Sequence, residues 1–229
     1  MIKAILFDFN GVIIDDETIQ MKAYQEVLSG HQVDLKEEWY FDSLGMDDRT
    51  FVKSMFERAK RPLTDPVLDT VIDAKTDMHR RMIEDQLPLF PGVLKFLKAT
   101  SRHFQLGLVS MANKAEVGFV FERANLTPFF SVVVTAEDSS MCKPAPECYN
   151  AGLTKLNELR QRERQLPLLA SECLAIEDSP PGIQSARAAG MRTLGVTNTV
   201  SAEALRAAGA EIVTASLADW TVDAVKLLY

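Results

Sequence analysis

The sequence predicts an α/β protein, with a parallel sheet covered by helices and an all-helical segment inserted after the first strand. From residue 91 onward, short apolar runs alternate with segments of helical periodicity, which is typical of βαβ units. Between about residue 16 and residue 86 the helical spacing recurs without any strand pattern. These two observations place the sheet in the first few residues and in the second half of the chain.

The first strand is predicted in the stretch 2–12, where an apolar run ends in Asp8, Asn10 and Gly11. A short run that is apolar on both faces is typical of a central strand in a parallel sheet. Ligands of open α/β sheets bind beyond the carboxyl ends of the strands, which is where Asp8 is expected to lie. Gly11 permits a sharp turn that a side chain would obstruct.

Three amphipathic helices are predicted in the inserted segment, which we delimit as residues 16–86. Each carries a stripe of apolar residues at helical spacing, and these stripes are expected to form the packed core of the insertion. The stripes are Ile19, Ala23 and Val27; then Phe51, Met55 and Ala59; then Val67, Val71, Ala74, Met78 and Met82. Residues 1–15 and 87–229 are left to form the α/β core.

Five further strands are predicted in the second half of the chain, at 104–110, 131–135, 173–178, 193–197 and 211–213. Helices are expected between them, beginning near residues 91, 117, 144 and 179, with a terminal helix at 222–228. Ser179 before two prolines is suited to cap a helix N-terminus.

Composition narrows the range of functions. The chain has 229 residues, of which 47% are hydrophobic and 25% charged, as in ordinary globular proteins. Its net charge of -7 disfavours a nucleic-acid partner. The three cysteines have no metal-ligand spacing, and the sequence shows neither a leader pattern nor an apolar run long enough to span a membrane. We therefore expect a cytoplasmic protein that has no membrane partner.

Polar side chains are predicted at four strand or loop ends: Asp8, Ser110, Lys143, and the pair Glu177 and Asp178. The carboxyl ends of parallel strands share one edge of the sheet, so these groups are expected to converge. Such a set suits phosphoryl transfer, in which the Asp8 carboxylate attacks phosphorus and forms an aspartyl-phosphate.

The carboxylates and the phosphate are all anions, so the same chemistry requires cations. Asp8, Asp178 and Glu177 are candidate ligands of Mg²⁺, which prefers oxygen ligands. Lys143 would compensate the remaining phosphate charge. The hydroxyl of Ser110 and the backbone N–H groups of Met111 and Ala112 would bind phosphate oxygens.

The motifs together resemble those of the haloacid dehalogenase-like hydrolase superfamily, close to its β-phosphoglucomutase and phosphoglycolate phosphatase branch. Residues 8–12 (DFNGV) resemble the first family motif, Ser110 the second, residues 143–147 (KPAPE) the third, and residues 177–179 (EDS) with Gly182 the fourth. The resemblance implies a Rossmann-like core with a helical cap. It also implies a Mg²⁺-dependent phosphohydrolase of a small phosphorylated metabolite.

One position departs from the family pattern. Family phosphatases carry a second aspartate two residues after the nucleophile, where it acts as a general acid and base, but this chain has Asn10. The resemblance implies that the backbone carbonyl of Asn10 would still bind the metal, as the family's carbonyl does at this position. Because general acid–base help contributes roughly 10²–10⁴-fold, we expect a slow enzyme, or one in which Asp15, Asp16 or Glu17 has taken over. Restoring Asp at position 10 is expected to raise turnover.

Three cap residues bear on the alternatives. By the resemblance, Arg49 would grip a distal phosphate, which supports a phosphosugar mutase as the runner-up. Gln20 replaces the histidine expected in the mutases, and Lys75 is interpreted as a solvated helix residue. A metal-free dehalogenase, which has no use for the Glu177 and Asp178 pair, and a ligand-binding pseudoenzyme, which Asn10 would suit, are the remaining alternatives.

Overall fold

The computed structural model describes residues 1–229 and contains one six-stranded parallel sheet in the order β3-β2-β1-β4-β5-β6. Its first strand, β1 (Ala4–Phe7), pairs with a strand on each side and is therefore central, as the sequence predicts. The other strands lie within one residue of their predicted bounds. They are β2 (Gln105–Val109), β3 (Val132–Val134), β4 (Cys173–Glu177), β5 (Arg192–Val196) and β6 (Ile212–Thr214).

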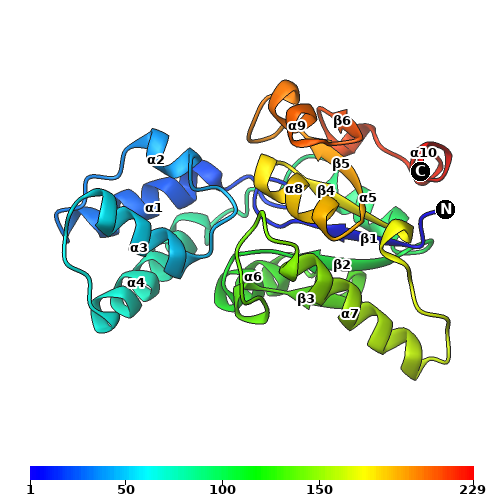
Figure 1. The fold of residues 1–229 in the computed structure, drawn as a ribbon, viewed down its shortest axis with the longest axis horizontal. Coiled ribbons are helices and arrows are strands. Elements are labelled where there is room, and N and C mark those ends of the chain that lie inside the picture. Colours follow the sequence, from blue (N-terminus) through cyan, green and yellow to red (C-terminus); the bar gives the residue numbers. More distant parts are fainter.

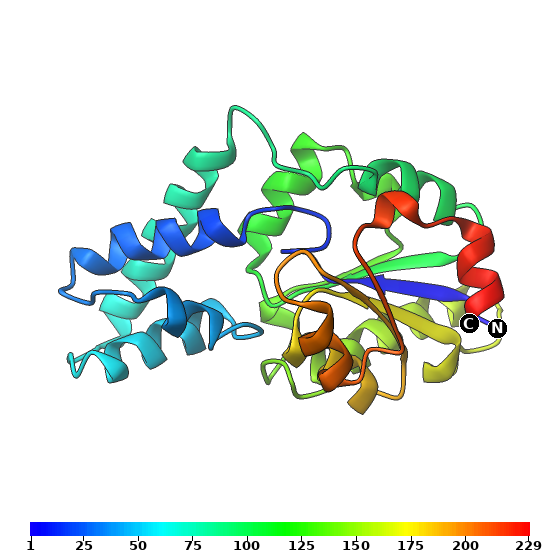
Figure 2. The ribbon, with the colours of Figure 1, turned by 90° about the horizontal axis from the view of Figure 1, so that it is seen from above.

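Helices cover both faces of the sheet (Figures 1 and 2). Successive strand side chains point to opposite faces, so Ile5 and Phe7 join one hydrophobic cluster and Ala4 and Leu6 another. The first cluster includes side chains of α5 (Val93–Thr100), α6 (Lys114–Arg123) and α10 (Val222–Leu228). The second includes side chains of α7 (Glu147–Arg162) and α8 (Pro180–Ala188). The helix α9 (Ala202–Ala208) packs beside α8. This Rossmann-like α/β arrangement confirms the predicted fold class.

Four helices follow β1 and lie beside the sheet as a separate group, at the left of Figure 1. They are α1 (Glu17–Ser29), α2 (Glu37–Phe41), α3 (Asp48–Arg58) and α4 (Asp65–Ile83). Their side chains form a hydrophobic cluster of their own, which includes Phe51 and Met55 as predicted. The short helix α2 has too few residues to show periodicity, and the sequence did not predict it.

The buried stripe of α4 differs from the predicted one. The predicted stripe ends at Met82, which is 42% exposed in the structure. The residues of α4 that are buried instead are Leu68, Val71, Lys75, His79 and Ile83. The buried face of α4 is therefore shifted by about one residue from the predicted face, because the polar side chains of Lys75 and His79 have partners in the interior. A hydropathy pattern does not show which polar side chains are buried, because it contains no information on their hydrogen-bond partners.

Helix starts follow the expected capping chemistry. The hydroxyl of Ser179 accepts a hydrogen bond from the Gly182 N–H at 3.4 Å, and the Asn113 side chain caps α6 by accepting from the Glu116 N–H at 3.0 Å. No helix in the structure combines the length and the apolar character needed to cross a bilayer.

Candidate active site

A pocket lies at the carboxyl ends of the central strands, where the sheet faces the four-helix group. Asp8, Ser110, Lys143 and Asp178 line it from the sheet side. Side chains of α1, α3 and α4 line it from the opposite side. The site residues predicted from the four motifs are therefore in one place.

Lys143 joins two of the predicted carboxylates. Its Nζ lies 2.8 Å from Asp8 Oδ1 and 2.6 Å from Glu177 Oε1, and the Tyr149 hydroxyl donates to the same Glu177 oxygen at 2.7 Å. Burial by itself lowers the pKa of Lys143, but the two carboxylates outweigh it and raise that pKa above its ordinary value. Lys143 is thus held as a cation beside Asp8.

Three buried carboxylates form a candidate metal centre. Oxygens of Asp8, Glu177 and Asp178 lie within 4.8 Å of one another, and Asp178 Oδ2 has no hydrogen-bond partner. Burial, followed by the negative charge of Asp8, raises the pKa of Glu177 to about 7, and the same two causes raise the pKa of Asp178 well above its ordinary value. A divalent cation would relieve this repulsion and provide the missing partner, so the donor set fits Mg²⁺.

Two glycines allow the acidic pair to approach the backbone. A Cβ at Gly11, where φ is +71°, would lie 1.9 Å from Asp178 Oδ2. A Cβ at Gly182 would lie 2.0 Å from Glu177 Oε2. No larger residue fits at either position, which gives a physical reason for the glycines in the first and fourth motifs.

The predicted phosphate-binding groups also lie at the pocket. Ser110 is 1% exposed, and Met111 and Ala112 line the same pocket. The Ala112 N–H, which the sequence predicts to bind a phosphate oxygen, is paired within the turn instead: it donates to the Ser110 hydroxyl oxygen at 3.0 Å.

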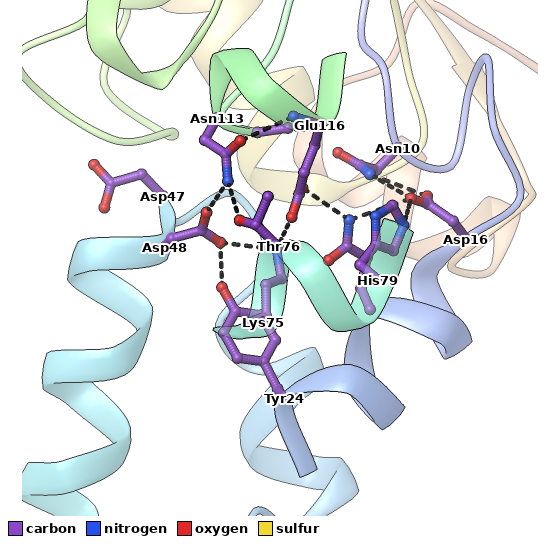
Figure 3. A network of polar contacts seen from close by, with 12 residues as sticks. Asn10, Asp16, Tyr24, Asp47, Asp48, Lys75, Thr76, His79, Asn113 and Glu116 are labelled. Atoms are coloured by element: carbon purple, nitrogen blue, oxygen red, sulfur yellow. Dashed lines mark hydrogen bonds and ion pairs between the residues drawn. The ribbon is translucent and has the colours of Figure 1, made fainter. Parts of the chain in front are cut away.

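Asn10 is engaged with Asp16. Its Nδ2 lies 3.0 Å from Asp16 Oδ1 and 2.9 Å from Asp16 Oδ2 (Figure 3). His79 Nε2 and Gln20 Nε2 also contact Asp16 Oδ2, at 2.8 and 3.2 Å. The Asp16 carboxylate is fully buried and committed to these three partners.

Glu17 is the acidic residue of this segment that lines the pocket. The Tyr40 hydroxyl donates to Glu17 Oε2 at 2.6 Å. Burial, assisted by the charge of Asp16, raises the pKa of Glu17 to about 7. Asp15, by contrast, is exposed.

Lys75 is buried, so its interpretation as a solvated lysine is wrong. Its Nζ lies 2.9 Å from Asp48 Oδ1 and 2.8 Å from Glu116 Oε1 (Figure 3). The residue is 2% exposed. Arg49 does not line the pocket: it is about half exposed and pairs with Asp69 at 2.6 Å. Adjacent residues on a helix point about 100° apart, so Asp48 faces inward and Arg49 does not.

Sequence reasoning missed that Lys75 and Glu116 link the helical group to α6 beside the sheet, and that His79 is buried against Asp16. One signal was available, because Lys75 and His79 continue the spacing of Leu68 and Val71 along one face of α4. Nothing in the sequence indicated Glu116 of α6 as the partner of Lys75, or Asp16 as the partner of His79.

The chain is similar to known proteins along most of its length. The family model of the haloacid dehalogenase-like hydrolases matches residues 2–190. The "Phosphorylated carbohydrates phosphatase" of Thermotoga maritima is 26% identical over 216 residues, which cover 91% of this chain and 92% of that protein. "Protein CbbY" of Rhodobacter capsulatus is 28% identical, with 84% of each chain covered.

Solved structures show the same fold. The β-phosphoglucomutase of Clostridium difficile superposes with a TM-score of 0.86 at 20% identity, covering all of this chain and 97% of that one. CbbY from Rhodobacter sphaeroides, in a complex with phosphate, superposes with a TM-score of 0.81 at 21% identity, covering 96% of each chain.

Proposed function

We propose that this chain, which belongs to the haloacid dehalogenase-like hydrolases, is a Mg²⁺-dependent phosphatase that releases inorganic phosphate from a small phosphorylated metabolite. The observation that carries the proposal is the arrangement around Asp8. Lys143 contacts the Asp8 carboxylate, and the carboxylates of Glu177 and Asp178 lie close to the same group. A phosphatase among the relatives supports the same reaction class.

In the proposed reaction, a carboxylate oxygen of Asp8 attacks phosphorus and the bond from phosphorus to the alcohol oxygen breaks. Lys143 offsets the charge of the phosphate, and the hydroxyl of Ser110 with the backbone N–H of Met111 binds its oxygens. Water then hydrolyses the aspartyl-phosphate, which releases phosphate and restores Asp8.

Asp8, Glu177 and Asp178, with the backbone carbonyl of Asn10, would hold the Mg²⁺ ion. When bound, the ion neutralises the clustered negative charge and allows a phosphate to approach. The acidic pair also argues against a metal-free dehalogenase, because such an enzyme gains nothing from two buried carboxylates beside its nucleophile.

Glu17 is our candidate for the missing general acid and base. Asn10 cannot transfer a proton, Asp15 is exposed, and Asp16 is occupied by its three partners. Glu17 lines the pocket and has a pKa of about 7, so both of its protonation states are populated at neutral pH. Protonated Glu17 would give its proton to the leaving alcohol, and ionised Glu17 would take a proton from the attacking water.

We assign residues 16–86 as the cap and residues 1–15 and 87–229 as the core. The cap supplies Glu17, Gln20 and Lys75 to the pocket and covers the sheet edge. Its contacts with α6 would break and reform as substrate enters and product leaves, and closure would exclude water from the reacting groups.

The test is phosphate release from phenyl phosphate, measured with Mg²⁺ and with a chelator. We expect Mg²⁺-dependent turnover that falls at least about a thousandfold in Asp8→Asn. Asp15→Asn, an exposed change in the same segment, is the matched control and should retain turnover. Chelator-resistant turnover, or full activity of Asp8→Asn, would contradict the proposal.

A further inference from the structure

We infer that the cap side of the pocket binds an uncharged, hydroxyl-bearing end of a phosphomonoester and excludes a second phosphate group. Gln20 is the residue that accepts a hydrogen bond from that end. The cap side is the end of the pocket that is lined by three cap residues, Gln20 of α1, Asp48 of α3 and Lys75 of α4, and by Glu116 of the core helix α6 that faces them. The inference rests on the proposed phosphatase function and adds its substrate class.

The orientation of the Gln20 amide is fixed by its neighbours. Its Nε2 lies 3.2 Å from Asp16 Oδ2 and 3.2 Å from Glu116 Oε2. Ionised carboxylates only accept hydrogen bonds, so the nitrogen and not the oxygen must face them. Both N–H groups of the amide are then used.

The remaining atom of that amide, Oε1, has no partner. Gln20 is 5% exposed and lines the pocket, and its Oε1 is a buried acceptor without a hydrogen bond. Buried acceptors rarely remain unpaired, because the loss of their hydration is unfavourable. A hydroxyl group of a bound substrate is a donor that would satisfy it.

The charges on the cap side exclude a second phosphate. Lys75 is its only cation, and both Asp48 and Glu116 already contact it. Lys143, the other cation that lines the pocket, is likewise shared by two carboxylates. Arg49 points to Asp69 and does not line the pocket.

The pocket as a whole is therefore rich in negative charge. Five carboxylates line it, against two lysines; they are Asp8, Glu17, Asp48, Glu116 and Asp178. A Mg²⁺ ion and the transferring phosphate would roughly cancel each other's charge. A second phosphate would meet Asp48 and Glu116 with no cation of its own, and like charges in a desolvated site repel strongly.

The experiment compares matched substrates on the unmodified protein with Mg²⁺. We expect kcat/KM for fructose 6-phosphate to exceed that for fructose 1,6-bisphosphate at least about tenfold, and the same order for glucose 6-phosphate over glucose 1,6-bisphosphate. Equal or better use of both bisphosphates overturns this inference alone. Absence of turnover on all four and on phenyl phosphate overturns the proposed function and this inference with it.

Two variants test the residues. Gln20→Leu should lower the kcat/KM ratio of fructose 6-phosphate to phenyl phosphate by about 2- to 10-fold, the effect of one hydrogen bond. Gln25→Leu on the same helix is the control, because the Gln25 amide donates to the Leu35 carbonyl and does not line the pocket. Its ratio should not change.

Glu116→Gln tests the charge argument in a chain that keeps the Gln20 side chain. It removes one of the two carboxylates on Lys75, so the kcat/KM ratio of bisphosphate to monophosphate should rise several-fold. An unchanged ratio in both Gln20→Leu and Glu116→Gln overturns the inference. If Gln20→Leu fails to fold, the Glu116→Gln result decides.

Discussion

The substitution Asn10→Asp tests whether an acid–base group at position 10 can function beside Asp16. From the sequence, Asn10→Asp is expected to raise turnover by supplying the acid–base group. The structure adds a condition, because the Asn10 amide donates to both oxygens of the Asp16 carboxylate at 3.0 and 2.9 Å. Asn10→Asp would replace a donor with a second carboxylate at that distance.

The size of the conflict follows from Coulomb's law. Two unit charges about 3 Å apart repel by roughly 5 kcal/mol at an effective dielectric constant of about 20. Since about 1.4 kcal/mol corresponds to one pKa unit, the pair would share a proton and only one member would ionise near neutral pH. His79, which also contacts Asp16, would offset part of this repulsion.

We therefore expect Asn10→Asp alone to raise turnover less than about tenfold and to lower stability. Adding Asp16→Asn supplies an amide donor to the new carboxylate, so the double variant should be about tenfold more active than the single variant; the gain stays below the full range of roughly 10²–10⁴-fold because Glu17 already supplies acid–base help. The assays are Mg²⁺-dependent phosphate release from phenyl phosphate and urea unfolding. A single variant as active and as stable as the double variant would refute the reasoning, since it would mean that Asp16 does not constrain position 10.

Three further predictions follow from the site. Glu17→Gln should lower kcat by roughly 10²–10⁴-fold and remove the limb of the pH–rate profile near pH 7, and an unchanged profile would exclude Glu17 as the acid and base. Lys143→Met should lower the free energy of unfolding by about 3–5 kcal/mol, because it leaves buried carboxylates unpaired. The control Lys155→Met removes a partly exposed ion pair and should cost at most about 1 kcal/mol. The pKa of Glu177 is raised from 4.5 to about 7, so the folded state binds more protons than the unfolded state and the metal-free protein loses stability as the pH rises between these values. Mg²⁺ should thus raise the melting temperature more at pH 8 than at pH 5, and equal shifts would contradict a metal site at this carboxylate.

The sheet was predictable because its signals are local. Apolar runs bounded by polar residues define strands within one residue, and parallel strands must place their carboxyl ends at one edge. For this reason the sequence alone predicts that Asp8, Lys143 and Glu177 meet. The departure at Asn10 was likewise visible in the sequence.

The environment of the polar side chains between the helical group and the sheet depends on long-range packing and is not visible in the sequence. Whether Lys75 is solvated or buried depends on Glu116, which is 41 residues away and lies on a helix of the other layer. Whether Asp16 is free or occupied depends on Asn10 and on His79 of α4. Helical periodicity records which residues share a face, but a charged residue is stable in the interior only where long-range packing brings it a partner.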